Sequence, residues 1–405
     1  MKNSKISFAK SLRRFHNQHR RQIRLCRERA ISSVRALFMS LALFGVTIGA
    51  PGAAFANALP TGAQVVSGDI QVQQAGAALQ VIQGSQAAIV NWQSFDIGHG
   101  ALVDIVQPSV DAALLSRVVG GNLSQIHGTL NANGHLYLIN PNGILFGQDS
   151  QVNVHALIAS TLDLADSDFL SGNLSFDGDS EASVMNLGSI NAEEFAALIG
   201  GDLENAGTLS VSGGSAALLA GDATLEIGEA AGGKIILDLS GLLNGSSVNS
   251  GTIDISSESG TGGRATILGG SVASSGSIDA SGLNGGGEVL VGGDYQGANP
   301  NLSNAQNTLV SGTISADAIE NGNGGRVILW ADDLTDFSGT ITVRGGDLSG
   351  NGGFVETSGK KLLSFTGSVD ASSPTGETGH LLLDPVDITI TTSSTDGVQN
   401  TSDTW

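Results

Sequence analysis

The chain of 405 residues contains 58 glycines, about twice the usual proportion, whereas only 14% of its residues are charged and 4% are aromatic. This composition excludes an ordinary α-helical protein, whose surface would need more lysine, arginine and glutamate than the chain supplies. The first 56 residues hold eleven of the 18 basic and one of the 38 acidic residues, so residues 57–405 carry a formal charge of −30, which argues against nucleic acid as a partner.

The N-terminal segment has the parts of a secretory signal peptide. A basic region precedes the apolar run Ala36–Ala50, and small residues follow it. The pattern predicts a long signal peptide over residues 1–56, cut between Ala56 and Asn57. A membrane-anchoring helix is the disfavoured alternative, because spanning a bilayer takes about 20 apolar residues. The only cysteine, Cys26, lies in this segment, so the expected mature chain has no disulfide.

Residues 57–180 are less repetitive than the rest of the chain and contain its densest local motif, which begins at Arg117. The pattern predicts a strand at Gly128–Leu130, an Asn-Gly turn, a strand at His135–Ile139, a Pro-Asn-Gly turn and a strand at Ile144–Phe146. We expect this segment to be an N-terminal cap with the first coils of the fold, which protects a strand edge that would otherwise be exposed.

The second of these turns has the chemistry of a very tight corner. Pro141 fixes φ at the first turn position, and Asn142 or Gly143 can adopt a positive φ. The side chain of Asn140 can bond the backbone two residues further along. The sequence therefore predicts that the chain reverses sharply between two apolar strands.

A short unit recurs in residues 181–405: glycine, then threonine or serine, then isoleucine, leucine or valine. Its glycines are Gly188, Gly207, Gly251, Gly276, Gly312, Gly339 and Gly367. In several units a Gly-Gly pair and a second apolar strand follow about a dozen residues later. Ile253 and Ile255 alternate with polar residues, which indicates one buried and one exposed face. Each unit predicts a strand, a Gly-rich corner and a second strand.

Short strands at this spacing, bounded by residues that can adopt a positive φ, favour an all-β fold: a right-handed parallel β-helix, or solenoid, with an N-terminal β-cap. We expect residues 57–180 to form the cap and first coils, and residues 181–405 to form Gly-rich repeats. The alternative is a β-sandwich or an up-and-down barrel. The recurrence of one unit favours the solenoid, because a sandwich does not need it.

The motif resembles the N-terminal secretion domain of filamentous-haemagglutinin-like exoproteins of two-partner secretion systems. The resemblance rests on three segments, Arg117–Asn122, Gly128–Gly134 and Asn140–Ile144, and on the long leader that precedes them. It is close over residues 57–180. Members of the family also carry an Asn-Pro-Asn-Leu motif, which we do not identify in this sequence. Either the chain belongs to a subgroup without the motif, or the corresponding corner uses other residues.

The resemblance implies a secreted, non-enzymatic, adhesin-like exoprotein of a Gram-negative bacterium. After crossing the inner membrane, such a chain is recognised while still extended by an outer-membrane β-barrel transporter with periplasmic recognition domains. It ends in the medium or at the cell surface, where a host-cell or surface receptor would be a further partner. The motif match implies transporter-recognition roles for Asn140, Pro141, Asn142, Gly143 and Ile144; shaping a turn that matters only for folding is the alternative role.

Two other functions stay open at this stage. One is a β-helical polysaccharide lyase or hydrolase, and the other is the delivery stalk of a longer toxin, since a chain that ends at Trp405 without a visible cap can be a fragment. The lyase would need clustered carboxylates beside a basic residue on one face of the solenoid.

The sequence predicts no catalytic residue, no metal site and no cofactor. The histidines of the expected mature chain lack metal-ligand spacing, and we interpret them as ordinary surface or turn residues; His127 and His135 are the only pair expected to approach each other. The tightest acidic cluster is Asp332, Asp333 and Asp336. Calcium binding for polysaccharide cleavage is one reading of it, and a solvated loop is the favoured one, because no basic residue lies nearby in sequence.

Overall fold

The computed structural model describes residues 57–230, 234–240 and 244–384. The predicted signal peptide, its cleavage after Ala56 and the end of the chain lie outside the described residues. Within the described part, no helix combines the length and apolar character needed to cross a membrane.

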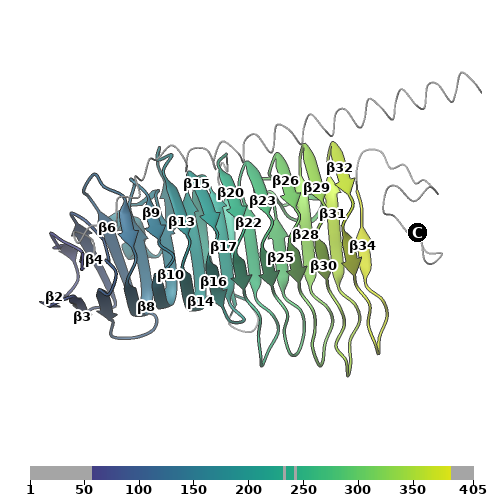
Figure 1. Cartoon of the computed structure of the whole chain (residues 1–405), viewed down its shortest axis with the longest axis horizontal. Coiled ribbons are helices and arrows are strands. Elements are labelled where there is room, and N and C mark those ends of the chain that lie inside the picture. The colour runs from purple at the N-terminus through teal and green to yellow at the C-terminus, as the bar shows by residue number, and fades with distance from the viewer. Residues whose placement is uncertain (1–56, 231–233, 241–243, 385–405) are drawn as a thin grey trace, which may run out of the picture.

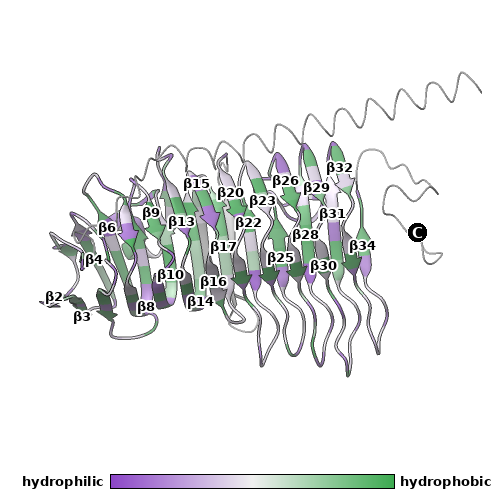
Figure 2. Cartoon of the chain, in the orientation of Figure 1, coloured by the Kyte–Doolittle hydropathy of each residue, from purple (hydrophilic) through white to green (hydrophobic). Residues whose placement is uncertain are grey.

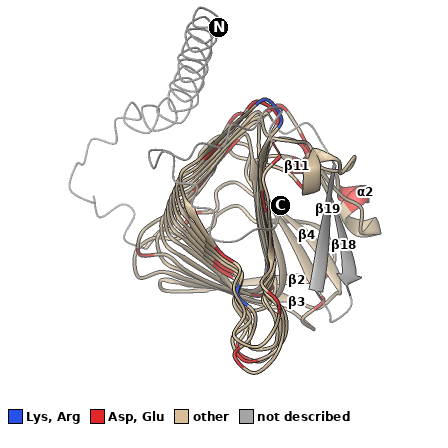
Figure 3. Ribbon diagram, turned by 90° about the vertical axis from the view of Figure 1, so that its right-hand side faces the viewer, with Lys and Arg blue, Asp and Glu red and all other residues tan. Residues whose placement is uncertain are grey.

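The chain winds into an elongated solenoid whose coils have three faces and a triangular outline when viewed end-on (Figures 1 and 3). The strands of face 1 are β3 (Ala78–Gln83), β5 (Leu102–Val106), the first parts of β8 (Thr129–Ile139), β10 (Gln151–Ser160) and β14 (Ser189–Gly200), then β16 (Thr208–Val211), β21 (Thr252–Asp254), β24 (Ser277–Asp279), β27 (Thr313–Ser315), β30 (Thr340–Thr342) and β33 (Ser368–Asp370). The strands of face 2 are β4 (Ala87–Trp92), β6 (Ala113–Val118), the second parts of β8, β10 and β14, then β17 (Ser215–Ala220), β22 (Arg264–Leu268), β25 (Glu288–Val291), β28 (Arg326–Ala331), β31 (Phe354–Gly359) and β34 (His380–Leu382).

Face 3 is a separate parallel sheet. Its strands are β7 (Ser124–Ile126), β9 (Ile144–Phe146), β13 (Ser183–Asn186), β15 (Asp202–Asn205), β20 (Ser246–Asn249), β23 (Ser271–Ser274), β26 (Asn307–Val310), β29 (Leu334–Phe337) and β32 (Leu362–Phe365). The predicted fold class, a right-handed parallel β-helix, is confirmed.

The recurring Gly-Thr-Ile units are in-register neighbours on face 1. Ser189 pairs with Thr208, which pairs with Thr252, and the same register continues to Ser368. The two longest intervals between units contain insertions: the hairpin of β18 (Ala223–Ala230) and β19 (Lys234–Ser240), and the loop 292–305, which includes the short 3-10 helix η1 (Tyr295–Gly297). The two longest intervals in the sequence are therefore coils that carry insertions.

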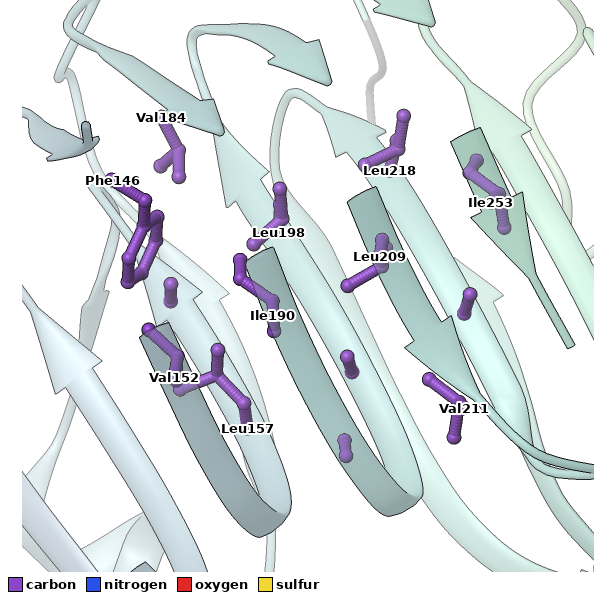
Figure 4. Packing of buried hydrophobic residues seen from close by; sticks show 14 of the residues in the cluster. Phe146, Val152, Leu157, Val184, Ile190, Leu198, Leu209, Val211, Leu218 and Ile253 are labelled. Atoms are coloured by element: carbon purple, nitrogen blue, oxygen red, sulfur yellow. The ribbon is translucent and has the colours of Figure 1, made fainter. Parts of the chain in front are cut away.

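Apolar side chains stack along the solenoid axis. Val152, Ile190, Leu209 and Ile253 occupy one register position in four successive coils and are buried (Figure 4). Apolar residues follow the strands along the whole molecule (Figure 2). Each coil thus buries its apolar face against its neighbours, as expected for a solenoid.

Buried asparagines reinforce this stack at the end of the face-3 strands. The Asn186 amide donates to the Asn205 Oδ1 at 2.8 Å, and the Asn205 amide donates to the Asn249 Oδ1 at 2.8 Å. All three side chains are buried, so each amide supplies the partner that its neighbour needs.

A flap covers the outer surface of face 2 in the N-terminal half. It consists of β11 (Asp163–Leu164), the helix α2 (Asp166–Ser171), β12 (Leu174–Asp177) and the hairpin β18–β19. Its elements β11 and α2 lie outside the triangle in Figure 3. Phe169 and Phe176 of the flap belong to a second apolar cluster together with Tyr137 and Ile139 of β8. Face 2 is therefore buried on both sides here.

Antiparallel strands close the N-terminal end. β1 (Gln64–Ser67) pairs with β4, and β2 (Ile70–Ala75) pairs with β3, whereas the coils that follow pair in parallel. The prediction of an Asn-Gly turn at Asn133-Gly134 is wrong. β8 is one continuous strand that bends from face 1 to face 2 at this point. Asn133 bonds the backbone N–H and C=O of Gln107, and neither turn residue adopts a positive φ.

Candidate functional site

The Asn140–Ile144 corner joins β8 of face 2 to β9 of face 3 and forms the tight turn that the sequence predicts. The Gly143 N–H donates to the Asn140 carbonyl at 3.0 Å, and the Asn142 N–H donates to the Asn140 Oδ1 at 3.0 Å. Gly143 carries the positive φ, at 109°. Asn140 is completely buried, whereas Pro141 and Asn142 are exposed.

This corner is bonded to the upstream motif Arg117–Asn122. The Asn142 amide donates to the Gly120 carbonyl, and the Asn140 amide donates to the Asn122 carbonyl, both at 2.9 Å. Asn140 also donates to the Ser124 Oγ. Two segments that the sequence shows as separate motifs are therefore one structural unit, in which Asn140 is the buried centre.

Arg117 holds the flap against face 2. Its guanidinium contacts Asp163 at 2.8 Å, Asp166 at 2.7 Å and the Leu164 carbonyl, and the arginine side chain is 14% exposed. The motif therefore ties together the corner, the flap and face 2. None of these contacts assigns a chemical reaction to the motif.

Four exposed side chains lie around the corner, and we call them the corner surface: Val119, Leu123, Pro141 and Asn142. Val119 and Leu123 are apolar residues that remain 50% and 38% exposed. The corner surface therefore combines apolar side chains with a polar amide, a combination typical of surfaces that contact other proteins.

The acidic cluster is paired with lysines from the next coil. Lys361 contacts Asp333, and the Lys360 Nζ lies 4.0 Å from Asp332, whose carboxylate also accepts bonds from Asn304 and the Trp330 indole. Asp336 is buried separately. Basic residues that are distant in sequence thus reach the cluster, as a lyase would require, but they form ion pairs with its carboxylates.

The expected approach of His127 to His135 is wrong, because each ring stacks on a different histidine. His127 stacks on His99, with ring centroids 4.8 Å apart, and His135 stacks on His155 at 5.8 Å. Burial lowers the pKa of both His127 and His135. Spacing along the sequence did not predict these pairs, because the number of residues per coil decides which histidines become neighbours.

Residues 56–293, more than half of the chain, match the family model of the TPS secretion domain. The chain belongs to the TPS secretion domain family. Over 80% of this chain and all of the other, the structure resembles the HMW1 secretion domain from Haemophilus influenzae, with a TM-score of 0.54 and 27% sequence identity. The TPS family is one of exoprotein secretion domains and not an enzyme family.

Two curated relatives of this TPS domain protein are heme/hemopexin-binding proteins of Haemophilus influenzae. One is 35% identical over 175 residues, which are 40% of this chain and 19% of the relative. The other is 43% identical over 116 residues, which are 28% of this chain and 12% of the relative. The matched parts thus span about a fifth or less of the curated relatives' length.

The interpretation that the chain lacks an Asn-Pro-Asn-Leu motif is wrong, because the motif occurs at Asn299–Leu302, beyond the residues that resemble the family closely. It forms the same kind of turn as the Asn140–Ile144 corner: the Asn301 N–H donates to the Asn299 Oδ1 at 3.0 Å, and the Leu302 N–H faces the Asn299 carbonyl at 3.3 Å. This sequence lies after residue 293, where the family match ends.

Proposed function

We propose that this chain is a secreted, non-enzymatic, adhesin-like β-helical exoprotein whose N-terminal domain is recognised by a partner outer-membrane β-barrel transporter. The observation that carries the proposal is the match of residues 56–293 to the TPS secretion domain, supported by the likeness to the HMW1 secretion domain. The route leads through the periplasm and the outer membrane to the medium or the cell surface.

We further propose that the corner residues divide into two roles. In the folded corner Asn140, Gly143 and Ile144 are buried and shape the turn, whereas Pro141 and Asn142 are exposed. Because the transporter meets the chain while it is still extended, folded-state burial does not by itself select the contacts. We assign them to Pro141 and Asn142 because the folded core needs these two side chains least. Exposure makes the two roles separable, because replacing an exposed side chain costs little stability. A secretion defect at an exposed position would then report recognition rather than folding.

The test compares Asn142→Ala with Asn140→Ala, and uses Asn153→Ala, an exposed asparagine on face 1, as the control. Binding of each urea-unfolded chain to the purified periplasmic domains is measured, followed by refolding after dilution. We expect Asn142→Ala to weaken binding about tenfold and to refold normally. Asn140→Ala should bind normally and lose about 2–4 kcal/mol of stability, because buried partners lose their hydrogen bonds.

Normal binding of Asn142→Ala combined with failed folding would contradict the recognition role and leave the corner as a folding element only. We do not propose heme or hemopexin as a ligand of this chain, because the matches cover only 19% and 12% of the heme/hemopexin-binding proteins. A receptor for this chain therefore stays a separate proposal within the adhesin-like function.

A further inference from the structure

Three potential metal ligands converge outside the Asn140–Ile144 corner, on adjacent coils. His135 lies on β8, His155 on β10 and Glu194 on β14, where these strands bend from face 1 to face 2. At this bend His155 lies opposite two residues in each neighbouring strand, because the register shifts between Val154 and Ala156. The shift brings side chains 59 residues apart in sequence into contact.

The distances suit a small metal ion. The Glu194 Oε2 lies 2.9 Å from the His135 Nε2 and 3.6 Å from the His155 Nε2, and all three ligand atoms lie within 4.8 Å of one another. Ligands of a tetrahedral zinc ion, with bonds of about 2.0–2.1 Å, are about 3.4 Å apart. The two distances to Glu194 bracket that value.

A second carboxylate orients one of the rings. The Glu193 Oε2 lies 2.8 Å from the His155 Nδ1, so the ring can donate its Nδ1 proton to Glu193 and direct its Nε2 lone pair toward Glu194. Carboxylate, histidine and metal form this chain in many zinc sites. Glu193 and Glu194 together would balance the two positive charges of the ion.

The surroundings hold the ligands in place and leave access to solvent. The side chains of His135 and His155 are 14% and 18% exposed, and that of Glu194 is 31% exposed. The two imidazole rings are stacked nearly parallel, and the His135 ring also packs edge-on against Phe195, with centroids 5.4 Å apart. A water molecule can therefore reach the fourth position of a metal that these three residues hold.

We propose that His135, His155 and Glu194 form a binding site for Zn²⁺ or a similar divalent transition-metal ion, with Glu193 as the supporting carboxylate. A donor set of two imidazoles and one carboxylate favours zinc over calcium or magnesium, which prefer oxygen ligands alone. The His135 Nε2 would bind the ion as a neutral imidazole with its proton on Nδ1, so the ion would replace the hydrogen bond between His135 and Glu194. It would tie together three successive coils of the secretion domain.

The test is calorimetric titration of the EDTA-treated, dialysed full chain with ZnCl₂, with MgCl₂ as the parallel metal. We expect Zn²⁺ to bind with a stoichiometry near one and to raise Tm by a few degrees, and Mg²⁺ to do neither. His155→Gln should lose this binding at least 100-fold, and Glu193→Gln should weaken it about 10–100-fold. Co²⁺ bound to the wild type should show visible absorption typical of a tetrahedral site.

His99→Gln is the matched control, because His99 belongs to the other stacked histidine pair. His16, His19 and His380 are present in every variant, so zinc bound there cancels in the comparison. Equal zinc affinity in the wild type and in His155→Gln, or no zinc binding by the wild type, would overturn the proposal. If circular dichroism shows that His155→Gln is unfolded, Glu194→Gln decides by the same titration and the same criterion.

Discussion

The glycines that open the face-1 strands are required by close approach between coils. A Cβ on Gly276 would collide with the Gly251 carbonyl oxygen, and one on Gly312 would collide with the Gly276 carbonyl oxygen. None of the seven repeat glycines has a positive φ. Contact between stacked backbones, and not a left-handed backbone conformation, therefore explains these seven glycines.

Gly276→Ala should destabilise the chain by about 1–3 kcal/mol, because the neighbouring coil must move to admit a methyl group. The control is Gly121→Ala, since no atom lies within 4 Å of a Cβ there and the glycine has no positive φ. Urea unfolding followed by circular dichroism measures both variants. Equal midpoints for the two would refute the close-approach explanation.

Glu356 gives the solenoid a pH-dependent weakness. Burial raises the pKa of this carboxyl above 4.5, although the Gln296 N–H and the Ser358 hydroxyl bond to it. The folded chain therefore binds this proton more tightly than the unfolded chain does. The stabilisation that the folded chain gains by binding this proton more tightly is fully present below pH 4.5. It is lost as the pH rises through the folded-state pKa of Glu356.

Glu356→Gln should thus raise Tm at pH 7 and leave Tm less dependent on pH above pH 4.5. The neutral amide still accepts a bond from Gln296 and carries no buried charge. Thermal unfolding at several pH values measures the effect, with the exposed Glu377→Gln as the control. A lower Tm for Glu356→Gln at pH 7 would show that the charge stabilises the fold.

At the scale of the element, one arginine adds polar contacts to the apolar packing between the flap and face 2. Arg117 of face 2 bonds three residues of the flap segment, Asp163, Leu164 and Asp166. The two carboxylates are 56% and 42% exposed, so water can solvate them when the arginine is removed. The expected loss is therefore moderate rather than the large loss of a fully buried pair.

Arg117→Met should cost about 1–2 kcal/mol and speed hydrogen exchange mainly in residues 163–177. Exchange measured by mass spectrometry localises the effect. The control is Lys361→Met, whose side chain is 69% exposed and whose ion pair should contribute little. Unchanged exchange in the flap of Arg117→Met would show that apolar packing of Phe169 and Phe176 alone holds it.

The charges on face 2 also follow the register of the elements. Arg264, Glu288 and Arg326 occupy one position in three adjacent strands, and Glu288 pairs with both arginines. In a parallel stack identical residues would place like charges side by side. The alternation avoids this repulsion, and Asp294 from the inserted loop neutralises Arg326 further.

At the scale of the whole molecule, the sequence predicts the features that depend only on residues close together in the chain. The Gly-Thr-Ile units and the Asn140–Ile144 turn need only neighbours in sequence, and both were predicted from it. The two insertions, the bend of β8 at Asn133-Gly134 and the cluster of His135, His155 and Glu194 were missed. Each depends on how many residues complete a coil, which the sequence does not state locally.

We propose that this β-helical secretion domain directs export through a partner transporter. Expression of the chain in a Gram-negative host, with and without a matched outer-membrane partner barrel, followed by quantification of the protein in the medium, tests this most directly. We expect release only when the partner is present. Release without the partner, or retention in the periplasm despite it, would contradict partner-dependent export.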